Sequence, residues 1–336
     1  MKKYDILTYF YISRTFYSMN IRTFANYFFN QNCVSPKRLL VFYMNSMENA
    51  QIQENSQSEQ LEVKPAVLDY EDLRKIIPFF DGKEKLCRWC MRRLSIDKVN
   101  KIHSDNCHTP GIPFVQGLLK DLDITLKIKN EEVLKNLPEG GFITVSNHPF
   151  GALDGIMLIK IIGEQRPEFK VMVNMFLNHI SAMRPNFIDV DALASDNPAK
   201  RAVSMKGIAE ALRHVKEGKP IGFFPAGAVS KFKWTWGVRI QDRAWQPTIM
   251  RIIQKLNVPI IPIYFHGHNS AWFTFLGMVD WRLRTLRLPA EVFRTKGKTR
   301  RISIGNPILP EDYAQYTAPE DLATFLKDKT YSMKKW

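Results

Sequence analysis

The sequence predicts an α/β fold: a layered mixed sheet flanked by helices and preceded by a small helical subdomain. Across residues 139–336, short runs rich in β-branched residues alternate with segments of helical periodicity. Across residues 67–138, the apolar residues instead keep a helical spacing. The length of 336 residues and the hydrophobic content of 45% suit one large domain with an appendage and exclude a wholly disordered chain.

The first 46 residues differ from the rest in composition. They contain 12 of the 40 aromatic residues, and six basic residues against one acidic residue give them a charge of +5. One interpretation is an interfacial membrane anchor with basic flanks. The other, which we favour, is translated upstream sequence ahead of a start at Met47, followed by a polar, Gln-rich linker over residues 47–66.

Periodicity assigns the elements that follow. In the helical subdomain, helices are predicted at Tyr70–Ile77, near Leu94–Ile102 and at Phe114–Leu122. In the α/β part, strands are predicted at Phe142–Ser146, Lys170–Asn174, Phe187–Val190, Ile221–Phe224, Pro259–Phe265 and Arg301–Ile304. Helices are predicted there at Gly155–Ile162, Ala199–Lys216, Thr248–Leu256 and from Pro319 onward.

The charge balance favours an anionic partner. Lys and Arg number 48 against 33 Asp and Glu, which gives a net charge of +15. No run approaches the roughly 18 uninterrupted apolar residues that a membrane-spanning helix needs, and the mean hydropathy is −0.24. The four cysteines are too few for a disulfide scaffold, and no signal peptide is recognised. We therefore expect a reduced, cytosol-facing compartment.

The segment Ser146–Gly155 places a histidine and a carboxylate around a turn. Histidine suits general-base chemistry near neutral pH, and a nearby carboxylate would fix its tautomer. His148 and Asp154 are six positions apart, about 240° of turn on a helix at ~100° per residue. They can meet only if residues 149–153 form a loop, which the Pro and Gly in that stretch favour. A structural histidine is the simpler alternative.

A second turn follows the predicted strand Ile221–Phe224. The sequence runs Phe223-Phe-Pro-Ala-Gly-Ala-Val-Ser-Lys231, a buried strand leading into a turn with Pro and Gly. Such a junction exposes backbone N–H groups that can bind an anion or an oxyanion. A plain strand-ending turn is the alternative.

Together these motifs resemble those of the glycerophosphate and lysophospholipid acyltransferase family. Pro185–Ile188 stands where that family has its Phe-Ile block, and Val258–Ile263 resembles its closing Val-Pro-x-x-Pro strand. The resemblance covers residues 139–306, and four motifs in order are far more specific than any one. It implies that His148 removes the proton of an acceptor hydroxyl, Asp154 orients His148, and backbone N–H groups near Pro225–Gly227 or the His148 turn stabilise the oxyanion.

Several positions depart from the family pattern. One extra residue separates the histidine from the aspartate. The Glu, Thr and Arg of the family's Phe-Pro-Glu-Gly-Thr-Arg-Ser are Ala226, Ala228 and Val229 here, and Asp189 stands where the family has Arg after Phe-Ile. In the family these side chains help to hold a glycerol-phosphate head group. A phosphate-bearing acceptor is therefore not expected.

The particular forms Asn147-His-Pro-Phe-Gly-Ala-Leu-Asp-Gly155 and Phe224-Pro-Ala-Gly227, after Ile96-Asp-Lys-Val-Asn100, are similar to a narrower branch. That branch comprises the bacterial aminolipid O-acyltransferases, often labelled hemolysins, which finish ornithine- or glycine-type lipids. It implies a 3-hydroxyacyl amino acid lipid as acceptor and an acyl thioester of acyl carrier protein or coenzyme A as donor. No metal or redox cofactor is expected, because the thioester is already activated. A 1-acylglycerol-3-phosphate acyltransferase is the alternative enzyme.

These arguments select a set of site residues. His148 and Asp154 are the predicted catalytic residues. The predicted substrate-binding residues are Asn147, Arg184, Phe224, Pro225, Gly227, Ser230 and Lys231, of which Arg184 and Lys231 are the nearest basic candidates for a carboxylate. We expect a peripheral protein at the cytoplasmic face of the inner membrane, with an anionic membrane surface as a partner and no nucleic acid.

A zinc-finger protein that binds nucleic acid is the alternative to an enzyme. Cys87, Cys90, His103 and His108 have the spacing Cys-x2-Cys-x12-His-x4-His, which together with the net positive charge would suit nucleic-acid binding. Against it, Asn100 stands where a finger needs a core leucine, and Leu86–Ile102 also fits a helix of the helical subdomain. We therefore expect free thiols instead.

Other features give weaker signals. Trp281–Arg301 holds eight basic residues against the single acid Glu291, with Trp272 nearby. This stretch is either a solvated basic face or a docking surface for anionic lipid or an acidic carrier protein. Trp234, Trp236 and Trp245 either line an acyl channel or fill the core. The sequence has no Gly-x-Ser-x-Gly of a serine hydrolase, no complete P-loop and no dinucleotide fingerprint.

Overall fold

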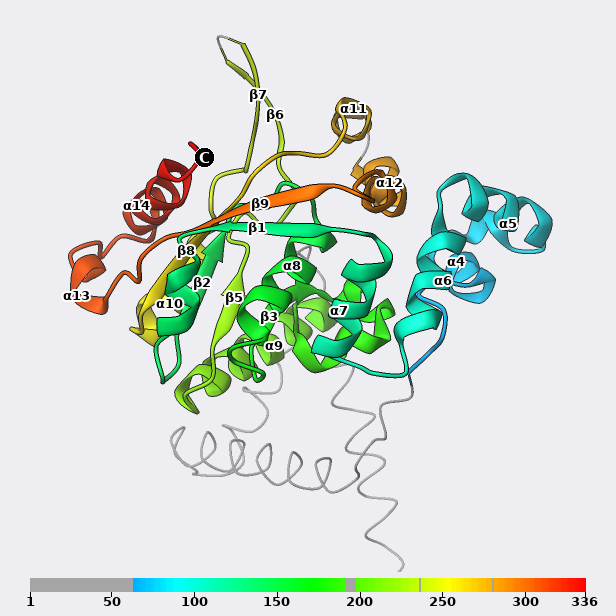
Figure 1. The fold of residues 1–336 in the computed structure, drawn as a ribbon. Helices are drawn as coiled ribbons and strands as arrows, with labels where there is room; N and C mark the ends of the chain where they lie inside the picture. The colour runs from blue at the N-terminus through cyan, green and yellow to red at the C-terminus, as the bar shows by residue number, and fades with distance from the viewer. Residues whose placement is uncertain (1–62, 191–197, 236, 280) are drawn as a thin grey trace, which may run out of the picture. The chain divides into compact units, whose positions relative to one another are not determined.

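The computed structural model describes residues 63–190, 198–235, 237–279 and 281–336. Residues 63–336 form one compact unit, whose described elements are coloured in Figure 1. The predicted N-terminal segment 1–46 lies outside the described residues, as does the predicted linker up to residue 62.

The described chain begins with helices, as the apolar spacing predicts. They are α4 (Tyr70–Ile76), α5 (Glu84–Arg93), α6 (Ile96–Asn106) and α7 (Ile112–Asp121), with a short 3-10 turn at Pro78–Phe80. The sequence is compatible with one helix over Leu86–Ile102, but α5 ends at Arg93. Ser95 then takes a left-handed φ of 61° ahead of α6, which breaks the helical path.

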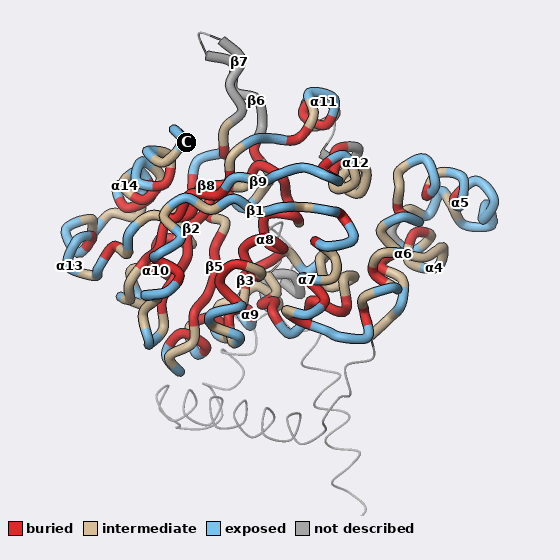
Figure 2. Tube along the Cα trace, viewed as in Figure 1, coloured by how far each residue is buried: buried red, intermediate tan, exposed pale blue. Residues whose placement is uncertain are grey.

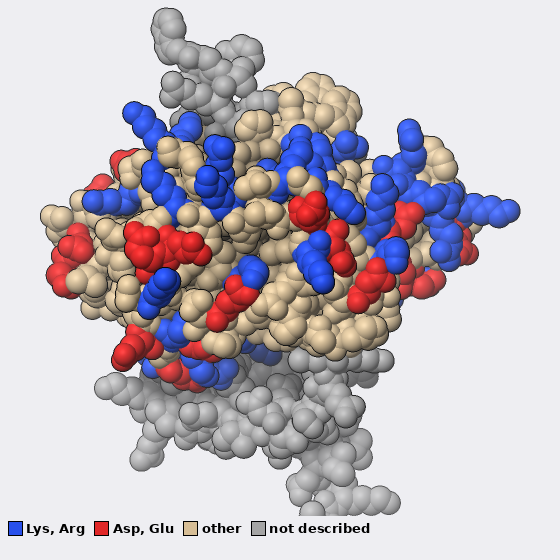
Figure 3. Space-filling model, viewed as in Figure 1, with Lys and Arg blue, Asp and Glu red and all other residues tan. Residues whose placement is uncertain are grey.

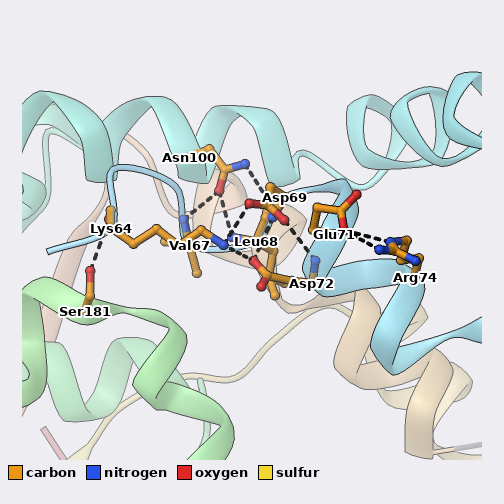
Figure 4. A network of polar contacts seen from close by, with 9 residues as sticks. All are labelled: Lys64, Val67, Leu68, Asp69, Glu71, Asp72, Arg74, Asn100 and Ser181. Atoms are coloured by element: carbon orange, nitrogen blue, oxygen red, sulfur yellow. Dashed lines mark hydrogen bonds and ion pairs between the residues drawn. The ribbon is translucent and has the colours of Figure 1, made fainter. Parts of the chain in front are cut away.

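Polar contacts connect these helices (Figure 4). Asn100 of α6 accepts hydrogen bonds at Oδ1 from the N–H groups of Val67 and Leu68, at 3.0 and 3.1 Å. Its Nδ2 donates to the Leu68 carbonyl at 2.7 Å. Lys64 lies 2.7 Å from Asp69, whose side chain caps the start of α4. Asn100 therefore braces the segment before α4, which is a structural role.

A seven-stranded sheet forms the centre of the molecule, in the order β1-β9-β8-β2-β5-β3-β4. Its strands are β1 (Thr125–Lys129), β2 (Ile143–Ser146), β3 (Lys170–Asn174), β4 (Phe187–Val190), β5 (Ile221–Phe223), β8 (Ile260–Phe265) and β9 (Thr299–Ile304). Neighbours pair in parallel except β8 and β9, which are antiparallel. The predicted mixed sheet is confirmed.

Strand β1 belongs to the sheet although it lies within the predicted helical subdomain, residues 67–138. It pairs in parallel with β9 over its whole length, from Thr125 beside Thr299 to Lys129 beside Ser303. Residues 63–336 also form a single compact unit. The chain therefore has no separation at residue 139, because the end of the helical part supplies an edge strand of the sheet.

Helices cover both faces of the sheet (Figures 1 and 2). These are α8 (Ala152–Gly163), α9 (Pro198–Lys216), α10 (Pro247–Leu256) and α14 (Pro319–Ser332), with α7 and the short α13 (Pro310–Tyr313). One buried cluster joins α7 and α8 to Ile261 and Ile263 of β8. A second joins α9, α10 and α14 to Ile143 and Val145 of β2. Alternate strand residues thus face opposite helix layers.

Further elements emerge near the carboxyl ends of the central strands. β6 (Lys231–Thr235) and β7 (Gly237–Gln241) form an antiparallel hairpin that follows β5. α11 (Ala271–Val279) and α12 (Trp281–Arg294) follow β8. These four elements were not predicted from the sequence. Among the described residues, the structure contains no helix of sufficient length and apolar character to cross a membrane.

Candidate active site

His148 lies just beyond the carboxyl end of β2, a central strand of the sheet. Every residue of β2 is buried, and the strand runs parallel to β5 on one side and β8 on the other. Parallel strands buried on both faces read as continuous apolar runs, which is why the sequence locates β2 accurately. Loops at the carboxyl ends of such strands are the usual place for binding sites in open α/β sheets.

A short turn brings Asp154 back to His148. Gly151 has φ +81°, a conformation that favours glycine, and α8 begins at Ala152. The sequence predicts this helix only from Gly155; the earlier start places Asp154 in its first turn. Asp154 Oδ2 accepts hydrogen bonds from the N–H groups of Phe150 at 2.8 Å and Gly151 at 3.0 Å. The carboxylate therefore caps α8 and fixes the turn.

His148 and Asp154 form the pair that the sequence predicts. Nδ1 of His148 lies 3.1 Å from Oδ2 of Asp154. Asp154 is fully buried, and this burial raises the pKa of its carboxyl, opposed by His148 and the two backbone N–H groups. The His148 side chain keeps 18% exposure and packs against the Phe224 ring, with 4.4 Å between centroids. With Nδ1 toward the carboxylate, Nε2 is the atom that can take a proton from substrate.

The turn after β5 is joined directly to the histidine turn. The Ser230 N–H donates to the His148 carbonyl at 2.9 Å, and Gly227 takes φ +62°. The Gly227 N–H already donates to the Phe224 carbonyl at 2.9 Å. The Phe150 and Gly151 N–H groups are likewise bonded to Asp154. These three N–H groups are engaged within the turns, and the stabilisation of an oxyanion by N–H groups near Pro225–Gly227 or the His148 turn stays a prediction.

Asp242 is a buried carboxylate that the sequence analysis missed. Its Oδ1 accepts from the His148 N–H at 3.2 Å and from Ser230 Oγ at 2.5 Å. Its Oδ2 accepts from Trp245 Nε1 at 3.4 Å, and its own N–H donates to the Tyr331 hydroxyl at 3.2 Å. Asp242 thus connects both turns of the site to α14. The motif Gln-Asp-Arg carries no signal of this role, since the contacts all come from the tertiary fold.

A cavity of 680 Å³ opens beside His148. Its wall combines His148, Gly155 and Phe224 with apolar residues of β3, β4, α9 and α10. His148 is the one ionisable residue among the lining residues that the structure describes. Three of the predicted site residues line this cavity: His148, Phe224 and Gly227. An apolar cavity that ends at a polar catalytic group has the form of an acyl-chain site.

The other predicted substrate contacts have different surroundings. Asn147 is buried and holds the end of β8: its Nδ2 donates to the Phe265 carbonyl at 2.9 Å, and its Oδ1 accepts from the Phe265 N–H at 2.7 Å. The Pro225 carbonyl accepts from the Gln246 N–H at 2.9 Å, and Ser230 binds Asp242. The polar groups of Asn147, Pro225 and Ser230 therefore bind other protein groups and support the site.

Of the two predicted carboxylate-binding residues, the structure describes the side chain of Arg184 only. Arg184 is exposed on a short 3-10 turn, where its Nε donates to the Asn178 carbonyl at 3.3 Å. It does not line the cavity. The side chain of Lys231 lies outside the described residues. A family motif fixes position along the chain, whereas the direction of a long side chain depends on its local turn.

The residues of the zinc-finger spacing lie in the helical part. Cys87 is fully buried in α5. His103 is buried in α6, with Nδ1 2.9 Å from the Pro65 carbonyl and Nε2 3.5 Å from the Ala182 N–H. Both ring nitrogens of His103 therefore contact main-chain groups. Trp245, which the sequence assigns to either channel or core, is a core residue.

Comparison with protein families assigns most of the chain to one family. The family described as acyltransferase matches residues 73–336. The chain belongs to this family, and it is an enzyme that transfers acyl groups.

Two relatives carry the same name, lyso-glycine lipid O-acyltransferase. The protein from Phocaeicola vulgatus is 28% identical over 245 residues, covering 70% of this chain and 83% of the relative. The protein from Bacteroides thetaiotaomicron is 27% identical over 246 residues, covering 70% and 85%. A solved structure, the 1-acyl-sn-glycerophosphate acyltransferase of Thermotoga maritima, has a TM-score of 0.40 and 14% identity over 66% of this chain and 83% of that one.

Proposed function

We propose that this protein transfers an acyl chain from an acyl thioester to the hydroxyl of a lyso-aminolipid, a 3-hydroxyacyl amino acid. The observation that carries the proposal is the His148–Asp154 pair at an apolar cavity of 680 Å³. Such a cavity suits an acyl chain, and the pair suits proton removal from an alcohol. The two relatives named lyso-glycine lipid O-acyltransferase support the choice of acceptor.

In the proposed reaction, Nε2 of His148 takes the proton of the acceptor hydroxyl as its oxygen attacks the thioester carbonyl. The buried carboxylate of Asp154, 3.1 Å from Nδ1, stabilises the imidazolium that forms. Collapse of the tetrahedral intermediate breaks the carbon–sulfur bond, and the thiolate of the donor leaves and takes up the proton. The thioester is already activated, so the proposal includes no metal or redox cofactor.

The choice of head group rests on the residues at the family's phosphate-binding positions. Asp189 is partly buried and accepts a hydrogen bond from Asn178, and burial raises the pKa of its carboxyl. Ala226 is buried and Val229 carries no polar side-chain atom. The side chains at these positions cannot donate charge-assisted hydrogen bonds to a phosphate dianion, as the Arg of the family pattern can. We propose a head group with a single carboxylate instead.

The donor and the location complete the proposal. The donor is the thioester of acyl carrier protein or coenzyme A, and the enzyme works as a peripheral protein on an anionic membrane surface. The net charge of +15 supports such a surface. The cytoplasmic face of the inner membrane is the side on which these thioesters occur, and we place the enzyme there.

A direct competition assay tests the acceptor. Purified protein receives an acyl thioester and either lyso-glycine lipid or lysophosphatidic acid at equal concentration. Each charge-assisted hydrogen bond is worth about 1.5–3 kcal/mol, so the loss of two predicts a preference for the aminolipid of roughly a hundredfold or more. A clear preference for lysophosphatidic acid would overturn the aminolipid assignment and leave the acyl-transfer chemistry intact. Zinc analysis of the same sample tests the absence of a metal cofactor.

A further inference from the structure

Helix α11 exposes an unusual row of large apolar side chains. Trp272, Phe275 and Met278 are 54%, 45% and 63% exposed, at i, i+3 and i+6 of the helix. The rings of Trp272 and Phe275 stack with 5.4 Å between centroids. Phe273 and Thr274, on the opposite side, are buried. One face of α11 therefore anchors the helix and the other presents an apolar row to the outside.

This helix is fixed to the catalytic turn through α12. Glu291 of α12 accepts hydrogen bonds from the Ser270 N–H at 2.8 Å and from Ser270 Oγ at 2.6 Å, which holds the start of α11. A Cβ added to Gly151 would lie 3.1 Å from Leu288 of α12, so α12 packs on the turn that carries His148. Helix α12 thus links α11 to the active site: Glu291 binds the start of α11 through hydrogen bonds, and Leu288 packs against Gly151 of the histidine turn.

The topology places α11 on the active-site side of the sheet. β2 and β8 are parallel neighbours; His148 follows the carboxyl end of β2, and α11 follows that of β8. Both features therefore leave the same edge of the sheet, and Figure 1 shows α11 and α12 together at that edge.

Basic side chains lie on one side of this row, at the end of α12. Arg294, Lys296 and Lys298, at the end of α12 and after it, are exposed. The nearby acid Glu291 is buried and lies 3.1 Å from Arg294, so it adds little negative charge to the surface. Figure 3 shows Lys and Arg side chains gathered beside the uncharged surface at the position of α11. An apolar row bordered by cations matches the interfacial layer of an anionic bilayer.

We propose that α11 is the membrane-docking element of this enzyme: Trp272, Phe275 and Met278 enter the interfacial layer while the neighbouring cations contact anionic head groups. This inference rests on the proposed function, because a lipid-modifying enzyme must bring its catalytic edge to the lipid. It assigns the membrane contact to a particular helix and orients the catalytic turn toward the bilayer.

A second exposed apolar group lies on the helical part and supplies a matched control. Phe79, Leu86 and Trp89 are 62%, 40% and 53% exposed. They lie on α5 and the preceding 3-10 turn, and Figure 1 shows α5 at the end of the described unit, away from α11. Docking through this group would not bring the His148 edge to the membrane.

The experiment measures co-sedimentation of the full chain with vesicles, without acyl donor or acceptor. The vesicles are pure phosphatidylcholine or an equimolar mixture with phosphatidylglycerol. The test variant carries Trp272→Ser, Phe275→Ser and Met278→Ser, and the control carries Phe79→Ser, Leu86→Ser and Trp89→Ser; circular dichroism checks that both fold. We expect the wild type to prefer the anionic vesicles, the control to match it, and the α11 variant to bind roughly tenfold more weakly or worse.

Three results would overturn the proposal: wild-type binding to neither vesicle, undiminished binding of the α11 variant, or equal loss in both variants. If the α11 variant is unfolded, the single change Met278→Ser replaces it. We expect this variant to lose a smaller part of its binding to anionic vesicles. Unchanged binding would contradict the proposal. Because no substrate is present, these results are independent of acyl transfer. Failure of the proposed function appears separately, as absent turnover of a lyso-aminolipid dispersed in detergent.

Discussion

Asp154 combines two tasks in one buried carboxylate. Oδ2 accepts the backbone N–H groups of Phe150 and Gly151 and also faces His148 Nδ1 at 3.1 Å. A charge placed in such a dry site is costly unless donors surround it. The helix cap thus supports the ionised form that the proposed role of His148 requires.

The change Asp154→Asn separates these tasks. The amide oxygen in the place of Oδ2 keeps the cap and can still face Nδ1, but it carries no negative charge to stabilise the imidazolium. We expect kcat to fall roughly 10²–10⁴-fold with KM and the melting temperature little changed. Steady-state kinetics checks this, with Asp105→Asn on the exposed side of α6 as a control. Unimpaired kcat in the folded variant would contradict the orienting role.

Asp242 positions the site without lining the cavity, and Ser230→Ala tests this role. The change removes the 2.5 Å bond from Ser230 Oγ to a buried carboxylate oxygen. We expect the free energy of unfolding to fall by about 1–3 kcal/mol, and kcat to fall while KM for the acceptor stays near its wild-type value. Denaturant titration and kinetics measure the two effects. An unchanged free energy of unfolding would show that this hydrogen bond does not stabilise the fold.

At the scale of elements, the cavity joins β3, β4, α9 and α10 around one apolar space. Ile249 of α10 lines it, and Arg251 lies exposed on the same helix. A tryptophan placed at position 249 reduces the cavity, and a tryptophan placed at position 251 serves as a control outside the cavity.

Ile249→Trp is expected to shorten the preferred acyl chain. Each buried methylene contributes about 0.8 kcal/mol, so excluding two of them costs about 1.6 kcal/mol, roughly fifteenfold in relative kcat/KM. A series of acyl thioesters of increasing length reveals the shift. Arg251→Trp should leave the length profile unchanged, and an unaltered profile for Ile249→Trp would mean that the chain binds elsewhere.

The sequence predicted best the elements that are buried on both faces. The strands at Ile143–Ser146 and Lys170–Asn174 have mostly buried residues and are rich in β-branched side chains, and their predicted bounds nearly coincide with those of β2 and β3. β1 was missed because it is an edge strand whose residues Thr125, Lys127 and Lys129 are exposed. Its short polar alternation resembles a loop, and only the pairing with β9 makes it a strand.

The part of the site that lies in one short stretch of sequence was predictable. His148 and Asp154 were found because a turn of Pro and Gly separates a strand from a helix. Asp242 was missed because its partners come from distant turns and from α14. Arg184 does not line the cavity, and its predicted contact with a carboxylate stays a prediction, because the sequence does not specify where an exposed side chain points.

At the scale of the whole molecule, neutral buried histidines couple stability to pH. Burial lowers the pKa of His103 and of His214 below the ordinary value of 6.5. His103 Nε2 faces the Ala182 N–H, a donor that repels a second proton on the ring. Well above pH 6.5 both histidines are neutral in the folded and unfolded states, and there they contribute no pH dependence.

Below that value the unfolded chain binds protons that the two folded histidines resist, so the contribution of these histidines to stability falls as the pH falls, while the raised pKa values of Asp154 and Asp189 act in the opposite direction. Each such histidine contributes up to about 1.4 kcal/mol per pH unit until its folded-state pKa is reached. Urea titrations between neutral and mildly acidic pH measure the decline, and His103→Gln should reduce its slope. A slope that is the same in the wild type and in His103→Gln would contradict the buried neutral state of His103.

The account depends above all on His148 as the proton acceptor in acyl transfer. The most direct measurement is the rate of acyl transfer from an acyl thioester to a lyso-aminolipid by His148→Ala, beside the wild type and with the fold checked by circular dichroism and thermal melting. The account predicts a folded protein whose rate is roughly 10²–10⁴-fold lower. A folded His148→Ala protein that transfers the chain at the wild-type rate would contradict it.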